Sequence, residues 1–207
     1  MEPKTITVEM WSDIACPWCY IGKTNLKLAI ASFLKEQPNV KIQTIYHAYI
    51  LNPSMKETGE EYLSYNIKRW GSDSWTIPLR EKGKTVGCSF ANWKIWPNTL
   101  LAHCLILEAS KQGKADDLVE MIFKYLYEQG ENVGLKETLD KIAKEFGIEG
   151  EWNSKENIEI VQADDKKGKE VKGVHMVPHF SFNGVDQPES STPQIFLDCL
   201  RRAFERL

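Results

Sequence analysis

The feature that most constrains this chain is a pair of cysteines, Cys16 and Cys19, placed where a predicted strand gives way to a predicted helix. Residues 6–11 alternate in polarity as strands do, and through residues 26–34 apolar side chains recur every three or four positions, as on one face of a helix. At the first turn of a helix, free backbone N–H groups and the positive end of the helix dipole favour a thiolate over a thiol. The sequence therefore predicts a thiol–disulfide redox site at this Cys-x-x-Cys motif.

Length and charge exclude several classes of protein. The 207 residues are 42% apolar, which is enough for a sizeable core. The 26 basic and 29 acidic residues are spread along the chain, without the basic stripe that nucleic acids attract or the polybasic run that anionic membranes attract. The first residues lack the apolar region of a secretory signal, and no stretch is long enough to span a bilayer. We therefore expect a cytoplasmic protein that binds neither nucleic acid nor membrane, and its oligomeric state is left open.

Three further cysteines, Cys88, Cys104 and Cys199, complete an odd count with irregular spacing, which is not typical of a secreted disulfide framework. Cys104 and Cys199 lie on the apolar faces of predicted helices, which predicts buried, inert thiols. Cys88 is predicted to lie in a loop where nothing local marks it as reactive, and whether it has a redox role is left open.

The predicted elements follow the order β–α–β, then a helical block, then β–β–α. After a second strand at residues 40–46, residues 50–95 are predicted to be irregular apart from a short helix near residues 60–70. Helices are predicted near residues 97–111, 118–130 and 135–147, with another from Ser154. A strand at residues 178–182 runs into Asn183-Gly184, a strong hairpin signal, and Thr192-Pro193 begins the final helix.

This order is that of a thioredoxin fold with helices inserted in its middle, and the chain resembles the DsbA-like superfamily. Within it, three segments resemble the FrnE-like oxidoreductases: residues 11–23 (WSDIACPWCYIGK), 97–103 (PNTLLAH) and 173–184 (GVHMVPHFSFNG). The resemblance implies an α/β thioredoxin-like domain made of residues 1–50 and 151–207, interrupted by an inserted all-helical domain at residues 51–150.

The chain also departs from its relatives in two places. The related kappa-class glutathione transferases and 2-hydroxychromene-2-carboxylate isomerases typically carry serine in place of Cys16 and lack the partner at Cys19, so this chain departs from them toward disulfide chemistry. After the hairpin, the Ser-Gly-Ala-Gln-like segment usual in the FrnE-like group is replaced by residues 186–191.

The positions of the two cysteines predict different roles. Cys16, nearer the strand, is expected to be the exposed thiol that attacks, whereas Cys19, one turn into the helix, is expected to be shielded and to resolve the mixed disulfide. Pro17 suits the first turn of the helix, where its missing N–H costs little. Trp18 adds no charge beside the sulfur, so a thiolate there depends on backbone N–H groups and the helix dipole. Pro17 and Trp18 are also expected to contact substrate.

A Cys-x-x-Cys pair can also be half of a zinc site. Such a site needs two more ligands, and Pro178 between His175 and His179 prevents the regular helix that would bring those histidines together. We therefore predict redox chemistry and no metal.

The second half of the site is implied by the resemblance. In thioredoxin folds a cis-proline faces the Cys-x-x-Cys motif, and Val177-Pro178 matches it, so we expect a cis bond and a Val177 backbone that binds an extended peptide or glutathione. Asn98 lies on the first inserted helix, where relatives line the substrate cleft, and for His103 a place in the core or on the surface is expected.

Two further assignments come from the residues themselves. Trp11, Trp18 and Trp96 are expected to wall an apolar groove beside the sulfur. Asp13 could accept the proton of Cys19 or cap a turn, and both alternatives stay open.

The function predicted from these features is a thiol–disulfide oxidoreductase that exchanges with protein or small-molecule disulfides, with glutathione as a candidate co-substrate and no tightly bound cofactor. The direction of exchange depends on the reduction potential, which the sequence does not give. Two alternatives stay open: a glutathione-dependent transferase or isomerase of small hydrophobic compounds, and a non-catalytic module that binds a peptide or a metal.

Overall fold

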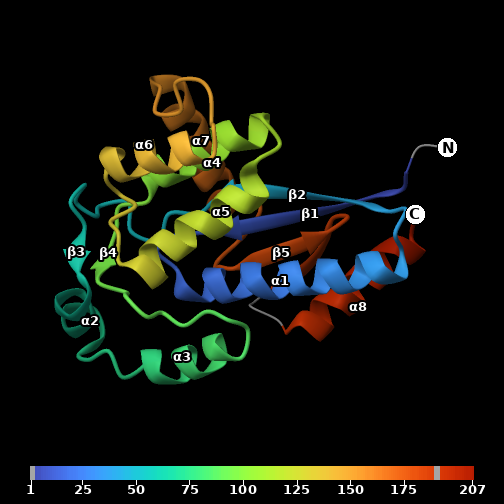
Figure 1. The fold of residues 1–207 in the computed structure, drawn as a ribbon, viewed down its shortest axis with the longest axis horizontal. Helices are drawn as coiled ribbons and strands as arrows, with labels where there is room; N and C mark the ends of the chain where they lie inside the picture. The colour runs from blue at the N-terminus through green and yellow to red at the C-terminus, as the bar shows by residue number, and fades with distance from the viewer. Residues whose placement is uncertain (1–2, 189–191) are drawn as a thin grey trace.

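A four-stranded sheet in the order β2-β1-β5-β6 forms the centre of the computed structural model, which describes residues 3–188 and 192–207 (Figure 1). Its strands are β1 (Thr5–Ser12), β2 (Lys41–Ala48), β5 (His179–Phe182) and β6 (Val185–Pro188). β2 runs parallel to β1, while β5 is antiparallel to β1 and β6 is antiparallel to β5. These are the pairings expected of a thioredoxin fold.

The alternation of apolar and polar residues along β1 matches the face that is buried. Ile6, Val8 and Met10 have no exposed surface and point into the main apolar core, as the period of two along a strand requires. Trp11, one position out of phase with them, belongs to a separate small cluster.

Two helices pack against each other beside the sheet. These are α1 (Pro17–Glu36) and α8 (Pro193–Glu205), and they lie side by side in Figure 1. α1 buries Leu26 and Phe33 on one face, as its apolar spacing predicts. α8 has Thr192 as its N-cap, whose hydroxyl accepts from the Ile195 N–H, so the predicted start of this helix is confirmed.

The chain between β2 and β5 is mainly helical. It contains β3 (Glu60–Glu61), α2 (Tyr62–Trp70), α3 (Thr76–Lys84), β4 (Ile95–Trp96), α4 (Leu100–Lys111), α5 (Ala115–Lys124), the π-helical turn η1 (Tyr125–Gln129), α6 (Lys136–Glu145) and α7 (Lys155–Glu170). β3 and β4 pair with each other, and α4 and α7 pack on each other and on β2.

α3 was not predicted, because residues 76–84 were expected to be irregular. Its sequence contains Pro78 and Gly83, which usually indicate a break, and only a few of its side chains are buried. Pro78 falls in the first turn, where its missing N–H costs little. A Cβ on Gly83 would lie 2.6 Å from the Cys88 carbonyl oxygen, so this close approach requires glycine.

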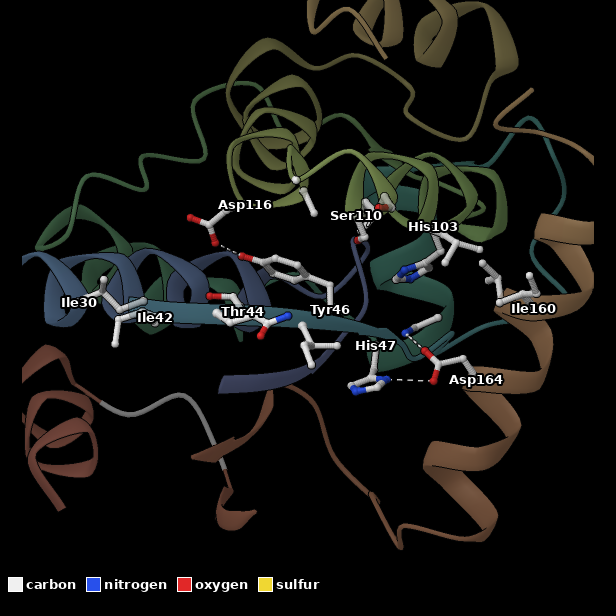
Figure 2. Close-up of a pocket in the computed structure, with 18 of the residues that line it drawn as sticks. Ile30, Ile42, Thr44, Tyr46, His47, His103, Ser110, Asp116, Ile160 and Asp164 are labelled. Atoms are coloured by element: carbon white, nitrogen blue, oxygen red, sulfur yellow. Dashed lines mark hydrogen bonds and ion pairs between the residues drawn. The ribbon is translucent and has the colours of Figure 1, made fainter. Parts of the chain in front are cut away.

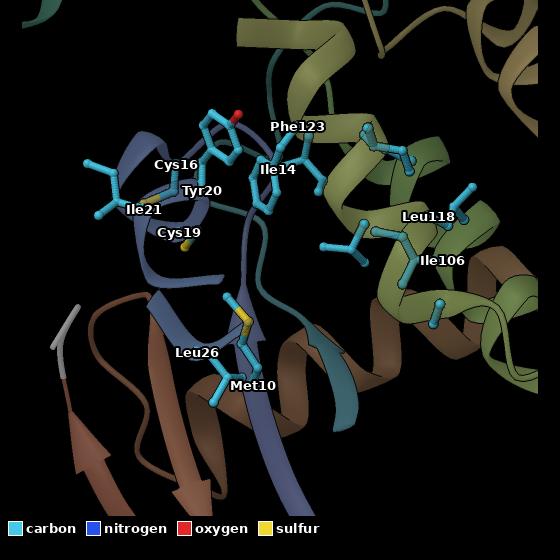
Figure 3. Packing of buried hydrophobic residues seen from close by; sticks show 14 of the residues in the cluster. Met10, Ile14, Cys16, Cys19, Tyr20, Ile21, Leu26, Ile106, Leu118 and Phe123 are labelled. Atoms are coloured by element: carbon cyan, nitrogen blue, oxygen red, sulfur yellow. The ribbon is translucent and has the colours of Figure 1, made fainter. Parts of the chain in front are cut away.

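One apolar cluster connects the sheet and α1 to α4 and α5 (Figure 3). Near the Cys-x-x-Cys end of α1, the ring of Tyr20 stacks on Phe123 at 5.4 Å and on Tyr127 at 5.6 Å between centroids. The Tyr127 hydroxyl donates to the Ile14 carbonyl oxygen at 3.1 Å. These contacts hold the helical residues against the start of α1.

The hairpin between β5 and β6 follows the predicted turn, with positive φ at both Asn183 and Gly184. Of residues 186–191, where the chain departs from the FrnE-like pattern, residues 189–191 lie outside the described residues. None of the helices described is both long and apolar enough to cross a membrane.

Candidate active site

Cys16 is the N-cap residue of α1, in extended conformation with φ −90° and ψ 110°. Its carbonyl oxygen accepts from the Cys19 N–H at 3.0 Å, which begins the helix, and Pro17 occupies the first turn as predicted. The Cys16 side chain does not cap the helix. Its side chain is left free for other contacts, and Cys16 lines the cavity beside α1.

The expectation that Cys16 is exposed was wrong. Only 5% of its surface is exposed, Cys19 has none, and both are free thiols. Burial raises the pKa of Cys19 well above its usual value, and a hydrogen bond with Cys16 raises it further. Cys19 is thus held as a thiol, while Cys16 is reached through the cavity that it lines.

The Val177–Pro178 peptide bond is cis, as predicted, and it lies against Cys16. The Cys16 Sγ donates to the Val177 carbonyl oxygen at 3.6 Å. α1 approaches this loop closely because Gly22 has no side chain: a Cβ there would lie 3.0 Å from Pro178 Cγ. The structure thus brings together two segments that are far apart in the sequence.

A cavity of about 440 Å³ opens beside Cys16, and its walls are rich in aromatic side chains. Trp18 and Trp96 line it as predicted. Tyr65, Trp70 and Trp75 also line it and were missed. The sequence signal for the two tryptophans was the concentration of tryptophans between residues 70 and 96, and no such signal pointed to Tyr65.

Trp11, predicted to wall this groove, lies elsewhere. Its ring stacks on His47 at 4.5 Å and meets His179 edge-on at 5.4 Å. Because side chains alternate along β1, Trp11 faces away from Met10, and it belongs to a small cluster against which Val177 packs outside the cavity.

Asn98 does not line the cavity, but its side chain hydrogen-bonds to backbone next to the cavity wall. Its Oδ1 accepts from the Leu100 N–H at 3.0 Å, and its Nδ2 donates to the Met55 carbonyl oxygen at 2.7 Å. Met55 and the neighbouring Thr99 line the cavity. Asn98 therefore supports the site from behind, and its predicted contact with substrate stays a prediction.

Asp13 is buried, and both of its carboxylate oxygens accept from backbone. Oδ1 accepts from the Ala15 N–H at 3.2 Å and Oδ2 from the Leu51 N–H at 2.7 Å. These contacts favour the turn-capping alternative, and transfer of a proton from Cys19 stays a prediction. His103 is buried in the core, with its Nε2 3.7 Å from Asp13 Oδ1.

The two histidines that flank Pro178 do not line the cavity. His175 is exposed, and His179 Nε2 lies 3.3 Å from Asp186 Oδ1. Within residues 3–188 and 192–207, no three His, Cys, Asp or Glu side chains come together as metal ligands.

The remaining cysteines are buried, as predicted for Cys104 and Cys199. Burial raises the pKa of both Cys88 and Cys104 to about 11. Cys88 Sγ lies 3.3 Å from the Thr24 hydroxyl, and Cys199 Sγ accepts from Arg202 Nη2 at 3.1 Å.

A second and larger cavity, of about 730 Å³, lies between β2, α4 and α7 (Figure 2). Two pairs of its polar side chains bind one another: Tyr46 donates its hydroxyl hydrogen to Asp116, and His47 Nδ1 lies 2.9 Å from Asp164 Oδ1. Asp164 also accepts from the Ala48 N–H at 2.8 Å.

Comparison with known proteins identifies the fold. Residues 7–200 match the family described as the DSBA-like thioredoxin domain. An uncharacterised protein of Bacillus subtilis, YwbO, is 21% identical over 155 residues, which are 70% of this chain and 68% of that protein.

Two solved structures have the same fold. A probable DsbA oxidoreductase from Streptomyces coelicolor superposes with a TM-score of 0.80 and 20% identity, over 98% of this chain and 91% of that chain. The cytosolic disulfide reductase DsbM from Pseudomonas aeruginosa superposes with a TM-score of 0.66 and 15% identity, over 97% of this chain and 100% of that chain, and it has also been solved with GSH. The predicted thioredoxin fold with inserted helices is confirmed.

Proposed function

Because this chain belongs to the family of DSBA-like thioredoxin domains, we propose that it is a thiol–disulfide oxidoreductase that acts through Cys16 and Cys19. The observation that carries the proposal is the placement of the Cys16 sulfur. It lies at the N-terminus of α1 and 3.6 Å from the Val177 carbonyl oxygen, and Cys16 is part of the wall of an aromatic cavity. A reactive sulfur, a backbone edge for substrate and a space for its side chain are thus adjacent.

The reaction has two steps. The Cys16 thiolate attacks one sulfur of a substrate disulfide, forming a mixed disulfide and releasing the other substrate sulfur as a thiolate, which takes up a proton. Cys19 then loses its proton and attacks Cys16, which forms the Cys16–Cys19 disulfide and releases the second substrate thiol. The substrate gains two electrons and the dithiol loses two, and the reverse sequence oxidises a substrate dithiol.

The burial of Cys19 supports this division of roles. Its raised pKa keeps the resolving thiol protonated and unable to compete for substrate, so attack begins at Cys16. Cys19 is one turn further into the helix and is close enough to Cys16 for a hydrogen bond between the two thiols.

Protein disulfides, small-molecule disulfides and glutathione are the proposed partners. The structural similarity to DsbM, which has been solved with GSH, supports glutathione as the co-substrate that returns the oxidised protein to the dithiol. No tightly bound cofactor is needed, since both electrons are carried by the two sulfurs.

Trapping of the mixed disulfide tests the proposal. We expect Cys19→Ser to accumulate a stable adduct after incubation with oxidised glutathione and Cys16→Ser to form none, as measured by intact mass. Cys104→Ser is the control, because it removes a buried thiol outside the site.

Equal adducts on the two active-site variants would contradict the proposed roles. If Cys19→Ser instead formed no adduct but processed a small hydrophobic substrate with glutathione at the wild-type rate, the transferase or isomerase alternative would replace the proposal, because that chemistry needs no second thiol.

A further inference from the structure

The cavity beside Cys16 contains a cation whose charge is unpaired among the described residues. Arg69, in the last turn of α2, lines the cavity and forms no ion pair or hydrogen bond with any residue in 3–188 or 192–207. The adjacent Lys68 is different, because its Nζ lies 3.3 Å from Glu60 Oε2. A guanidinium presents a planar fork of N–H donors that matches a carboxylate. Arg69 is therefore suited to bind an anionic group of a ligand.

The other charged side chain of the cavity wall does not oppose this. Asp13 is buried, and both of its carboxylate oxygens already accept backbone N–H groups from Ala15 and Leu51. Arg69, by contrast, is exposed. Within the cavity, the charge open to a ligand is thus positive.

The aromatic wall is fixed by its own contacts. The ring of Tyr65 stacks on that of Trp96 with 4.5 Å between centroids, and the ring of Trp70 packs on that of Trp75 with 5.0 Å between centroids. The Trp75 indole donates to Asn66 Oδ1 at 2.8 Å, which sets the orientation of its ring. The wall therefore presents preformed apolar faces to a ligand.

Part of this wall is open to solvent. Trp70 is 48% exposed and Leu51 is 51% exposed, although both line the cavity. When a ligand covers large apolar side chains that are half exposed, the burial of their surface is favourable and stabilises the complex. The cavity volume of about 440 Å³ falls in the range of about 300–1,000 Å³ typical of small-molecule sites.

Resting on the proposed function, we infer that the disulfides exchanged at Cys16 carry a bulky apolar or aromatic group next to the sulfur and a carboxylate that pairs with Arg69. The apolar group lies against Trp70 and Trp96. The carboxylate binds the Arg69 guanidinium, and the scissile disulfide lies at Cys16. Arg69 thereby determines specificity and takes no part in sulfur exchange.

Two aromatic disulfides test this assignment. Dithiobis(nitrobenzoate) carries a carboxylate on each ring, and dithiodipyridine carries none. Each releases a thiol with its own absorbance band, in the visible for the nitrobenzoate and in the near-ultraviolet for the pyridine, so one turnover of the pre-reduced protein is followed by absorbance. The Cys16–Cys19 dithiol supplies both electrons, and no added reductant is needed.

We expect Arg69→Gln to slow the reaction with dithiobis(nitrobenzoate) about tenfold, the effect of losing one hydrogen bond to a charged group. Its rate with dithiodipyridine should stay within about twofold of wild type, because the aromatic contacts remain. Arg69→Lys should restore part of the loss, and added salt should shrink it. Lys68→Gln is the matched control, since it removes the same charge one residue away and outside the cavity wall.

Equal slowing of both probes by Arg69→Gln, or slowing of dithiobis(nitrobenzoate) by Lys68→Gln to the same extent, would overturn the assignment. Failure of the proposed function looks different. In that case the wild-type protein and Cys16→Ser would react with both probes at the same rate.

Discussion

The cavity along β2 is larger than the cavity at Cys16, about 730 Å³ against about 440 Å³, but its lining contains no cysteine. Several of its polar groups are paired with each other, as in Tyr46 with Asp116 and His47 with Asp164, although the buried Nε2 of His103 accepts and donates no hydrogen bond among the described residues. The smaller cavity differs, with a thiol, an Arg69 that is unpaired among the described residues and a half-exposed Trp70. The larger volume therefore does not mark the site, whereas the thiol of Cys16 beside a cation unpaired within the described residues does.

The paired side chains of the large cavity have a structural role. Asp164 accepts both from His47 and from the Ala48 N–H, so it joins α7 to the end of β2. Ala48 is followed by the segment that reaches Leu51, on the wall of the smaller cavity. The paired side chains of the large cavity therefore help to hold the segment that forms part of the wall of the smaller cavity, beside Cys16.

The largest expected difference concerns thiol reactivity. In a short iodoacetamide pulse at neutral pH, we expect Cys16 to be alkylated at least about a hundredfold faster than Cys88 and Cys104. A pKa of about 11 leaves these two thiols almost wholly protonated at pH 7. Mass mapping of the reduced protein measures the order of labelling, and labelling of Cys104 or Cys88 before Cys16 would show that the nucleophile is misassigned.

A pair of matched truncations compares the two cavities directly. Trp70 in the small cavity is 48% exposed and Ile160 in the large cavity is 40% exposed, so neither is a core residue. We expect Trp70→Ala to slow single-turnover exchange with dithiodipyridine about three- to tenfold, because an aromatic contact worth about 0.5–1.5 kcal/mol beyond its buried area is lost. Ile160→Ala should stay within about twofold of wild type. The reverse order would place substrate binding along β2.

The smallest expected effect is a pH dependence of stability from the large cavity. Burial lowers the pKa of His47, but its hydrogen bonds to Asp164 and Glu9 outweigh burial, so the pKa of His47 is raised. This contribution to stability is full below the unfolded-state pKa of about 6.5 and is lost as the pH rises through the folded-state value. We expect His47→Gln to lose more unfolding free energy at about pH 5.5 than at about pH 8.5.

Denaturant titrations of wild type and His47→Gln at the two pH values measure this difference. Exchange with dithiodipyridine should be unchanged in the variant, because His47 lies outside the wall of the small cavity. A slower exchange rate together with an unchanged pH dependence would assign His47 to the reaction and not to the structure.

The sequence predicted those parts of the site that depend on residues close to one another in the chain. Cys16 and Cys19 share one helical turn, and Pro17 and the strand before them fix where that turn begins, so the order strand, motif, helix could be read directly. The proline at Val177–Pro178 was identified through the resemblance, because no local pattern distinguishes it from an ordinary strand start.

The cavity wall could not be predicted in the same way. Tyr65, Trp70 and Trp75 approach Cys16 through tertiary packing of α2 and α3, and α3 itself was hidden by Pro78 and Gly83. Trp11 is close to the motif in sequence, yet the alternation of β1 turns it away from the face that carries Met10. Nearness in sequence was thus a weaker guide than the phase of the strand.

The redox role of Cys16 and Cys19 is tested most directly by their redox equilibrium in a glutathione series, with the fraction of disulfide determined by acid quench, alkylation and mass. We predict a single two-electron transition, with a potential between about −270 and −120 mV, the range spanned by thioredoxin and DsbA. Cys16→Ser and Cys19→Ser should each abolish the transition, and Cys104→Ser should leave it unchanged. A protein whose Cys16 and Cys19 both stay reduced at every ratio of oxidised to reduced glutathione would contradict the central claim.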